Sequence, residues 1–278
     1  MPMMKDDSVV QFNKGLALYD LEKYNEAITY FDKALEINPD DEDTWYNKGL
    51  ALGELEKYDE AIICNNEAIK INPNDSSAWN NKGFALNTLK KSKEAINACD
   101  HAIRINPNHS HAWCIKGQSL NHLGKFEQAI NAYDRAIRIN PNYFNAWYNK
   151  GITLDNLEKY NEAIKAYNEA IQLEPDYYNT WYNKGLALCE LEKYNEAITY
   201  FDKALEINPD DEDTWYNKGI TLDNLEKYDE AIICYNEVIR LNPEYLDVWR
   251  EKGDVLVKLG KYDKARKCFD ISQRRQEG

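Results

Sequence analysis

The chain has 278 residues, of which 29% are charged, and its formal net charge is −14. This acidic balance disfavours nucleic acid and anionic membranes as partners, because both are negatively charged. Residues 1–11 contain no apolar run long enough for a signal peptide, and no later run approaches the length of a membrane span. The six cysteines form no CxxC pair, which is typical of reduced thiols. These features predict a cytoplasmic protein.

Tryptophan, proline and glycine recur through the chain with one shared period of 34 residues. The recurring positions are Trp45, Trp79, Trp113, Trp147, Trp181, Trp215 and Trp249, then Pro39, Pro73, Pro107, Pro141, Pro175, Pro209 and Pro243, and Gly15, Gly49, Gly83, Gly117, Gly151, Gly185, Gly219 and Gly253. Three side chains locked to one period identify a repeat array, since each unit must present the same residue to the same part of its neighbour.

In chain order, the array divides into units 8–41, 42–75, 76–109, 110–143, 144–177, 178–211 and 212–245, and a partial unit 246–278. The first helix of each unit is expected to open near the unit's first residue, and these residues are Ser8, Glu42, Ser76, Ser110, Phe144, Tyr178, Glu212 and Leu246. The whole chain is therefore expected to form a single array.

The unit 178–211 illustrates the expected pair of helices. Trp181, Gly185 and Leu188 follow one another at four and three residues, which places them on one face of a first helix over 180–191. A second helix is expected from Tyr194 up to the residues before Pro209, because proline cannot continue a helix. Each unit is thus predicted to be two helices joined by a short polar break.

Glycine inside the first helix needs a structural reason, because it costs about 1 kcal/mol relative to alanine. We expect Gly185 to allow close approach of the two helices, with Trp181 and Phe201 filling the wider spaces beside it. The lysine that precedes each of these glycines is expected to lie along apolar surface and to leave its ammonium group in water.

With Trp, Lys-Gly, Leu, Tyr, Ala, an aromatic residue, Ala and Pro in this order, the chain resembles the tetratricopeptide repeat (TPR) family. The resemblance implies an all-α fold, a right-handed α-solenoid superhelix of helix-turn-helix repeats whose first helices line the concave face. The departures include Gln11 at the first tryptophan site, Asn65 and Cys99 at the aromatic site, Ser92 at the tyrosine site and Val238 at the second alanine site.

The candidate site is the face of each first helix that the core does not use. The two positions after the tryptophan are most often tyrosine and asparagine, and stacking the units turns them into two ladders. An asparagine amide both donates and accepts hydrogen bonds, so a row of them can hold the backbone of an extended peptide. The resemblance implies this use, since family members with a similar row bind peptides with it. The alternative is that the pair serves helix packing or capping. The predicted peptide-binding residues are Asn13, Tyr46, Asn47, Asn81, Tyr148, Asn149, Tyr182, Asn183, Tyr216 and Asn217.

Acidic and polar residues continue along the same face, which favours basic partners through charge and cation–π contacts. The alternative is an ordinary solvated polar face. These residues are Asp20, Glu54, Asp155, Asn156, Glu190, Asp223 and Asn224, with Asp43, Asp213 and Asp247 at the helix starts.

All four histidines lie within 101–122, and His111, Cys114 and His122 share one helical stripe. This stripe is either a weak metal or pH-sensitive spot, or a local specialisation of the binding face. We expect no metal site, because His111 and His122 are about three helical turns apart.

The sequence contains no arrangement of nucleophile, base and orienting group and no glycine-rich phosphate loop. We therefore expect no catalytic residues, no cofactor and no enzyme activity. The predicted function is a protein–protein interaction scaffold that binds an extended peptide in the groove of the solenoid. Two alternatives remain open, namely head-to-tail self-association of the array and a targeting module for a separate enzyme.

Overall fold

The fold is that of a computed structural model, which describes the backbone of residues 3–274 and the side chains of residues 7–273. Within these residues every regular element is an α-helix, and sixteen helices follow one another as pairs. The chain forms two compact units, Met1–Ala146 and Trp147–Gly278. Residues 275–278, the end of the predicted partial unit 246–278, lie outside the described residues.

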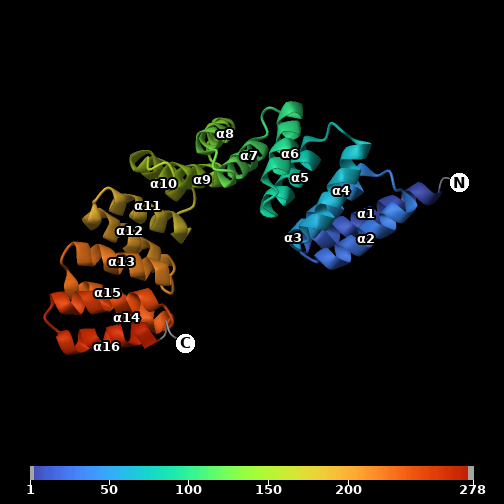
Figure 1. The fold of residues 1–278 in the computed structure, drawn as a ribbon. Helices are drawn as coiled ribbons and strands as arrows, with labels where there is room; N and C mark the ends of the chain where they lie inside the picture. The colour runs from blue at the N-terminus through green and yellow to red at the C-terminus, as the bar shows by residue number, and fades with distance from the viewer. Residues whose placement is uncertain (1–2, 275–278) are drawn as a thin grey trace. The chain divides into compact units, whose positions relative to one another are not determined.

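The first unit contains α1 (Met3–Asp20), α2 (Tyr24–Ile37), α3 (Glu42–Glu54), α4 (Tyr58–Ile71), α5 (Ser76–Thr88), α6 (Ser92–Ile105), α7 (Ser110–His122), α8 (Phe126–Ile139) and the start of α9 (Phe144–Asp155). The second contains the rest of α9, α10 (Tyr160–Leu173), α11 (Tyr178–Glu190), α12 (Tyr194–Ile207), α13 (Glu212–Asn224), α14 (Tyr228–Leu241), α15 (Leu246–Lys258) and α16 (Tyr262–Arg274). From α1 to α8 and from α10 to α16, each helix packs on the next (Figure 1). First helices of successive pairs also touch, as α3 touches α5 and α11 touches α13. Each unit is therefore an α-solenoid, as the period predicts.

The first helices from α3 to α15 begin at the seven residues that the sequence predicts, Glu42, Ser76, Ser110, Phe144, Tyr178, Glu212 and Leu246. The prediction for α1 is wrong, because this helix begins at Met3 and not near Ser8. Residues 3–7 contain no proline or glycine, so nothing in the local sequence interrupts the helix before Ser8.

A short turn with one left-handed residue joins the two helices of each pair, as Glu192 shows between α11 and α12 with a φ of 56°. The N–H of Glu192 donates to the carbonyl of Cys189 at 2.8 Å, and the N–H of Lys193 donates to that of Leu188 at 2.9 Å. These bonds satisfy the last carbonyls of the first helix. The same backbone recurs at Glu22, Glu56, Lys90, Gly124, Glu158, Glu226 and Gly260.

The second helices end where proline forces the chain out of the helical region. In α12 the last helical residue is Ile207, and Asn208 has a φ of −126° and a ψ of 88° before Pro209. The N–H of Asn208 donates to the carbonyl of Ala204 at 2.8 Å, which completes the helix end. This confirms the prediction that the second helix stops at the Asn-Pro pair.

The repeated glycine of the first helix accommodates an aromatic ring of the second helix. A Cβ added to Gly185 would lie 2.6 Å from Phe201 Cε1, which is closer than real atoms approach. Phe201 therefore packs directly on the glycine, and not in a wider space beside it as the sequence suggested. The other pairs of this kind are Gly15 with Phe31, Gly117 with Tyr133, Gly151 with Tyr167, Gly219 with Tyr235 and Gly253 with Phe269.

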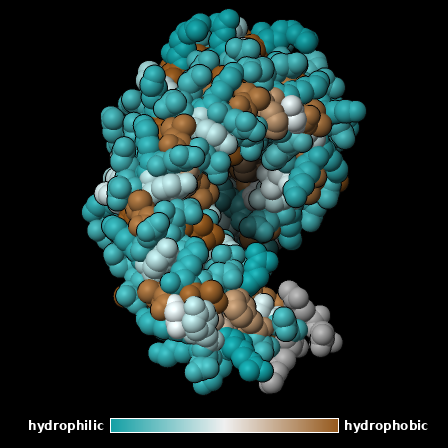
Figure 2. All heavy atoms as spheres, turned by 60° about the vertical axis from the view of Figure 1, so that its left-hand side comes forward, coloured by the Kyte–Doolittle hydropathy of each residue, from teal (hydrophilic) through white to brown (hydrophobic). Residues whose placement is uncertain are grey.

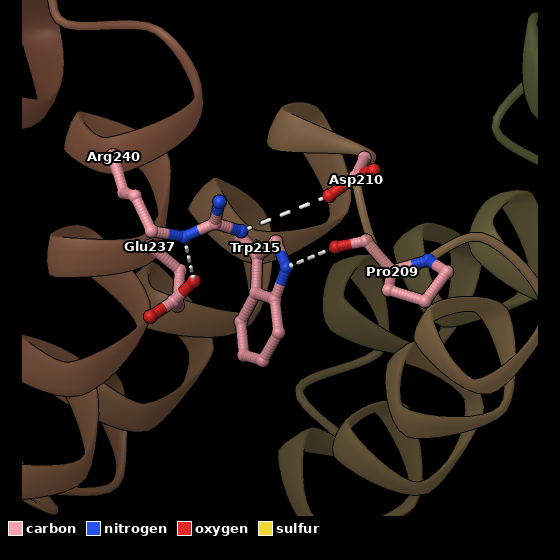
Figure 3. Close-up of polar contacts among 5 residues, drawn as sticks. All are labelled: Pro209, Asp210, Trp215, Glu237 and Arg240. Atoms are coloured by element: carbon pink, nitrogen blue, oxygen red, sulfur yellow. Dashed lines mark hydrogen bonds and ion pairs between the residues drawn. The ribbon is translucent and has the colours of Figure 1, made fainter.

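A hydrogen bond between the tryptophan and the proline explains why these two residues share the period. Trp215 Nε1 donates to the carbonyl of Pro209 at 2.8 Å, which fixes the loop to the start of α13 (Figure 3). Arg240 of α14 bridges the same loop, since its guanidinium group contacts both Asp210 and Glu237. Equivalent bonds join Trp45 to Pro39, Trp79 to Pro73, Trp113 to Pro107, Trp181 to Pro175 and Trp249 to Pro243.

The repeated lysine connects successive helix pairs. Lys218 Nζ lies 2.6 Å from Asp202 Oδ1 on the preceding α12 and 5.2 Å from the centre of the Trp215 ring. Lys48 and Lys116 form the same ion pair, with Asp32 and Asp100. The expectation that this ammonium group stays in water is therefore wrong at these positions, because an aspartate of the preceding pair holds it.

Candidate functional site

Two depressions of the same construction lie on the face formed by neighbouring first helices, which we call the first-helix face. The depression between α3 and α5 has a volume of 270 Å³, and that between α9 and α11 has a volume of 330 Å³. Their lining residues correspond across three periods, as Leu50 does to Ile152, Tyr58 to Tyr160, Asn65 to Tyr167, Asn81 to Asn183, and Phe84 to Leu186. The repeat therefore generates a recurring hollow beside the predicted asparagine ladder.

Two of the predicted asparagines bind the predicted tyrosine of the preceding helix pair. Asn183 Nδ2 donates to the hydroxyl of Tyr148 at 3.2 Å, and Asn217 Nδ2 donates to the hydroxyl of Tyr182 at 3.1 Å. Both asparagines are half-buried on the first-helix face. The two ladders are thus cross-linked within the second unit, and each bond fixes the orientation of an amide.

The remaining predicted asparagines have different surroundings. Asn47 Nδ2 donates to the carbonyl of Asp43 at 2.8 Å, one turn earlier in α3, as Asn217 Nδ2 also does to that of Asp213, and Asn13 is exposed on α1. Asn149 is half-buried on α9. Asn81 is half-buried on α5, and its Nδ2 is buried without a hydrogen-bond partner. The ladder is therefore regular in sequence but not in its bonding.

The predicted tyrosines contribute to packing as well as to the face. The ring of Tyr182 lies 6.2 Å from that of Phe201, the residue that covers Gly185. Tyr216 stacks on Tyr245 with ring centres 5.0 Å apart. Tyr46 is half-buried on α3. The rings of Tyr182 and Tyr216 thus take part in packing, which was one of the two alternatives for these tyrosines. The hydroxyls of Tyr148 and Tyr182 accept hydrogen bonds from the asparagines.

Tyr58, Asn65 and Phe84 are among the lining residues of the α3–α5 depression that were not predicted as site residues. The rings of Tyr58 and Phe84 meet edge to face with centres 6.3 Å apart at its rim, and Asn65 lies below them. The sequence signal for Asn65 is its departure from the aromatic residue of the repeat. The predicted acidic residue Glu54 lines the same depression.

The predicted acidic row is only partly available to a ligand. Asp155, Asn156 and Glu190 line the α9–α11 depression, which gives it an acidic wall. Asp223 instead forms an ion pair with Lys258, whose Nζ lies 2.7 Å from its carboxylate. Figure 2 shows one face of the molecule, which is largely hydrophilic and has its hydrophobic side chains in small groups.

Asp155 is the titratable group most affected by this site. Burial raises the pKa of its carboxyl group to about 6, although a hydrogen bond from the Tyr167 hydroxyl opposes the shift. Its Oδ1 is buried without a hydrogen-bond partner. The carboxylate is therefore a poorly solvated anion near neutral pH, which favours pairing with a cation.

The four histidines do not gather at one site, although the rings of His109 and His111 meet edge to face with centres 6.3 Å apart. His101 stacks on Trp79 with ring centres 4.3 Å apart, and His111 stacks on Tyr143 at 4.7 Å. His109 Nδ1 accepts from the N–H of Ala112 at 3.4 Å and so caps α7. Within residues 7–273, no three histidine, cysteine or acidic side chains are placed to share a metal ion. Three of the four histidines thus have packing or capping contacts.

Antiparallel helix pairs that stack through one recurring set of contacts define an α-helical solenoid repeat protein. Models of the tetratricopeptide repeat match residues 8–41, 42–75, 76–109, 144–177, 178–211 and 212–245, and further models of the same repeat match 98–131, 117–157 and 246–270. The chain belongs to the tetratricopeptide repeat family.

Several solved structures share the fold. A crystal structure of MamA is 24% identical with a TM-score of 0.57, over 58% of this chain and 94% of that one. MamA from Desulfovibrio magneticus RS-1 is 20% identical with a TM-score of 0.57, over 62% and 97%. YrrB, described as a TPR protein with an unusual peptide-binding site, is 24% identical with a TM-score of 0.53, over 65% and 93%. No curated protein sequence matches significantly. At these identities the likeness concerns the fold.

The helices of the described region are too short or too polar to cross a lipid bilayer.

Proposed function

We propose that this protein is a non-enzymatic scaffold that binds an extended peptide segment of a partner along the first-helix face. The observation that carries the proposal is the recurring depression, which has an asparagine amide in its wall both at Asn81 and at Asn183. The repeat family is one of protein interaction modules, and YrrB is described as having a peptide-binding site. An extended peptide presents donors and acceptors at regular spacing, which suits amides at regular spacing.

The bonding of Asn183 and Asn217 is compatible with this role. A carboxamide has two N–H donors and one oxygen acceptor, and the bond to a tyrosine hydroxyl uses one donor. In Asn183 the other donor and the oxygen can address a peptide carbonyl or N–H, whereas in Asn217 the second donor binds the carbonyl of Asp213 at 2.8 Å and only the oxygen is left for a peptide N–H. Because the tyrosine already holds the amide in one orientation, less conformational freedom is lost on binding. The predicted site residues therefore remain our proposal for the peptide contact.

The charge of the face favours a basic partner. Glu54 lines one depression, and Asp155 and Glu190 line the other, so lysine or arginine side chains of a peptide would meet carboxylates. The net charge of −14 adds long-range attraction for such a segment and repels acidic ones. Nucleic acid and anionic membranes remain disfavoured as partners on the same ground.

The proposal is tested by replacing Asn149, Asn183 and Asn217 together by alanine and measuring retention of partners from a lysate. We expect retention to fall strongly. The matched control replaces the exposed second-helix residues Asn97, Asn161 and Asn195 by alanine, which should leave retention unchanged. Equal retention by the groove variant and the wild type would reject the first-helix face as the binding surface.

Head-to-tail self-association is a second candidate, favoured by one observation. Val10 on α1 is 47% exposed, whereas Thr44 and Thr214, at the same position of later pairs, are fully buried. The exposed Val10 is therefore a surface that a second copy of the array could cover. Sedimentation velocity over a concentration series is the test, since a monomer at every concentration excludes this candidate.

A further inference from the structure

The depression between α3 and α5 differs from its counterpart at one core position. Asn65 stands where the α9–α11 depression has Tyr167, and where other pairs have Phe31, Tyr133, Phe201 or Tyr235. In those pairs a ring covers the glycine of the first helix, whereas Gly49 lines the open depression here. The smaller side chain therefore leaves Gly49 in the lining of this hollow, which has a volume of 270 Å³ against 330 Å³ for its counterpart.

Two asparagines in the lining of this hollow contain one acceptor and one donor that are buried and without partners. Asn65 is 1% exposed, and its Nδ2 donates to the carbonyl of Ala61 at 2.8 Å, while its Oδ1 is buried and unpaired. Asn81 Oδ1 accepts from Asn80 Nδ2 at 3.3 Å, while Asn81 Nδ2 is buried and unpaired. Buried polar atoms without partners are unfavourable, so both favour a group that supplies their missing bonds.

The open donor of Asn81 is a local feature and not a property of the ladder. Asn183 follows Tyr148 by 35 residues and donates to its hydroxyl. Asn81 follows Tyr46 at the same spacing, yet it makes no such bond and instead pairs with the neighbouring Asn80. The combination of Asn65 and Asn81 therefore sets this depression apart from its counterpart.

We propose that this depression is a specificity pocket for the carboxamide side chain of glutamine or asparagine in the bound peptide, an inference that rests on the proposed function. A carboxamide donates an N–H to Asn65 Oδ1 and accepts from Asn81 Nδ2, so it satisfies both atoms at once. Leu50, Tyr58 and Phe84 provide apolar walls for the methylene stem. Glutamine fits better than asparagine, because its longer stem reaches the buried Asn65 Oδ1.

Other peptide side chains match only part of this pattern. A carboxylate offers no donor to Asn65 and meets the negative charges of Glu54 and Glu56 at the lining. An ammonium group pairs with Asn65 and Glu54 but leaves Asn81 Nδ2 without an acceptor. An aliphatic side chain leaves both atoms unpaired. A polar site of this kind discriminates strongly against analogues that lack its hydrogen bonds.

The test uses an immobilised positional-scanning library of short blocked peptides, followed by calorimetry with one selected peptide and its Gln, Glu, Lys and Leu versions. We expect one library position to select glutamine, with about tenfold weaker binding of the Leu and Glu versions because two buried hydrogen bonds are lost. Asn65→Phe fills the pocket and Asn65→Cys removes the acceptor, and both should abolish the preference while the variant still binds the peptide.

The controls separate the pocket from the groove. Cys99→Phe makes the same aromatic replacement one period along the array and should keep the glutamine preference. Peptide binding without any preference for glutamine, or a preference that persists in Asn65→Cys, would show that water satisfies the two amides, and the pocket proposal would be wrong while the proposed function stands. If the wild type retains no peptide from the library, the proposed function fails together with the pocket.

Discussion

At the scale of single residues, the array is held together by repeated side chains, each of which forms a hydrogen bond, an ion pair or a packing contact with another residue of the array. Trp215 bonds the carbonyl of Pro209, Lys218 bonds Asp202, and Phe201 covers Gly185. The departure from this set at Asn65 leaves its Oδ1 unsatisfied. Local departures of this kind therefore mark positions where stability and function can be separated.

Asn65→Phe should raise the free energy of unfolding by about 1–3 kcal/mol, because it removes an unpaired buried acceptor and fills apolar space. Phe31 and Phe201 occupy the same position against their glycines, so the array accommodates the ring without strain. Urea denaturation followed by circular dichroism measures the change. A lower midpoint than that of the wild type would contradict this account of Asn65.

Asp155→Asn should stabilise the protein near neutral pH and lose this advantage in acid. Burial raises the pKa of the folded carboxyl group to about 6, above its ordinary value of 3.8, so the folded state favours the protonated form. The stability that protonation contributes is complete below the ordinary value and is lost as the pH rises through about 6. Asparagine stays neutral, and its oxygen can still accept from the Tyr167 hydroxyl.

The measurement for this variant is the difference in unfolding free energy between it and the wild type at pH 8 and at pH 4. We expect a larger stabilisation at pH 8. Asp223→Asn is the matched control at the equivalent position two periods along, where the carboxylate pairs with Lys258. It should lower stability at pH 8, and a similar gain for both variants would refute the role of burial at Asp155.

At the scale of elements, the helix limits follow from local chemistry and could be predicted. Proline fixed the ends of second helices such as α12, and the recurring spacing fixed the starts of seven first helices. The start of α1 could not be derived from the period, because residues 3–7 precede the first predicted repeat, 8–41, and contain no helix breaker. The left-handed residues of the turns were also missed, since glutamate and lysine give no signal for a positive φ.

Glu192→Gly should raise the free energy of unfolding by about 0.5–1 kcal/mol, even though glycine is normally destabilising. Glu192 has a φ of 56°, a conformation that costs an ordinary residue about 1–2 kcal/mol and costs glycine little. Gly124 already occupies the equivalent position in the first unit. Thermal and urea unfolding of Glu192→Gly and of the reverse control Gly124→Ala give the test, and the two changes should have opposite signs.

At the scale of the whole molecule, one type of helix pair is repeated, and the residues at certain positions differ from pair to pair. The sequence predicted this helix pair and the face on which the asparagines lie, because both follow from the period. It could not predict that Asn183 bonds Tyr148 while Asn81 does not bond Tyr46, since this depends on the relative placement of successive helices. The depression at Asn65 likewise needs coordinates, because its depth depends on what covers Gly49.

The acidity of the molecule makes a prediction about its partners that is independent of any single pocket. A lysine-rich peptide should bind more tightly than a matched glutamate-rich peptide, and raising the salt concentration should weaken its binding several-fold, because the net charge of −14 attracts it.

Glu54→Gln with Glu190→Gln should reduce this salt dependence, since both carboxylates line the depressions. Glu60→Gln with Glu162→Gln changes the charge equally on second helices and should have less effect. Fluorescence anisotropy of labelled peptides measures these affinities. Equal effects of the two double variants would assign the attraction to the net charge of the molecule, and equal affinities for the two peptides would exclude a basic partner.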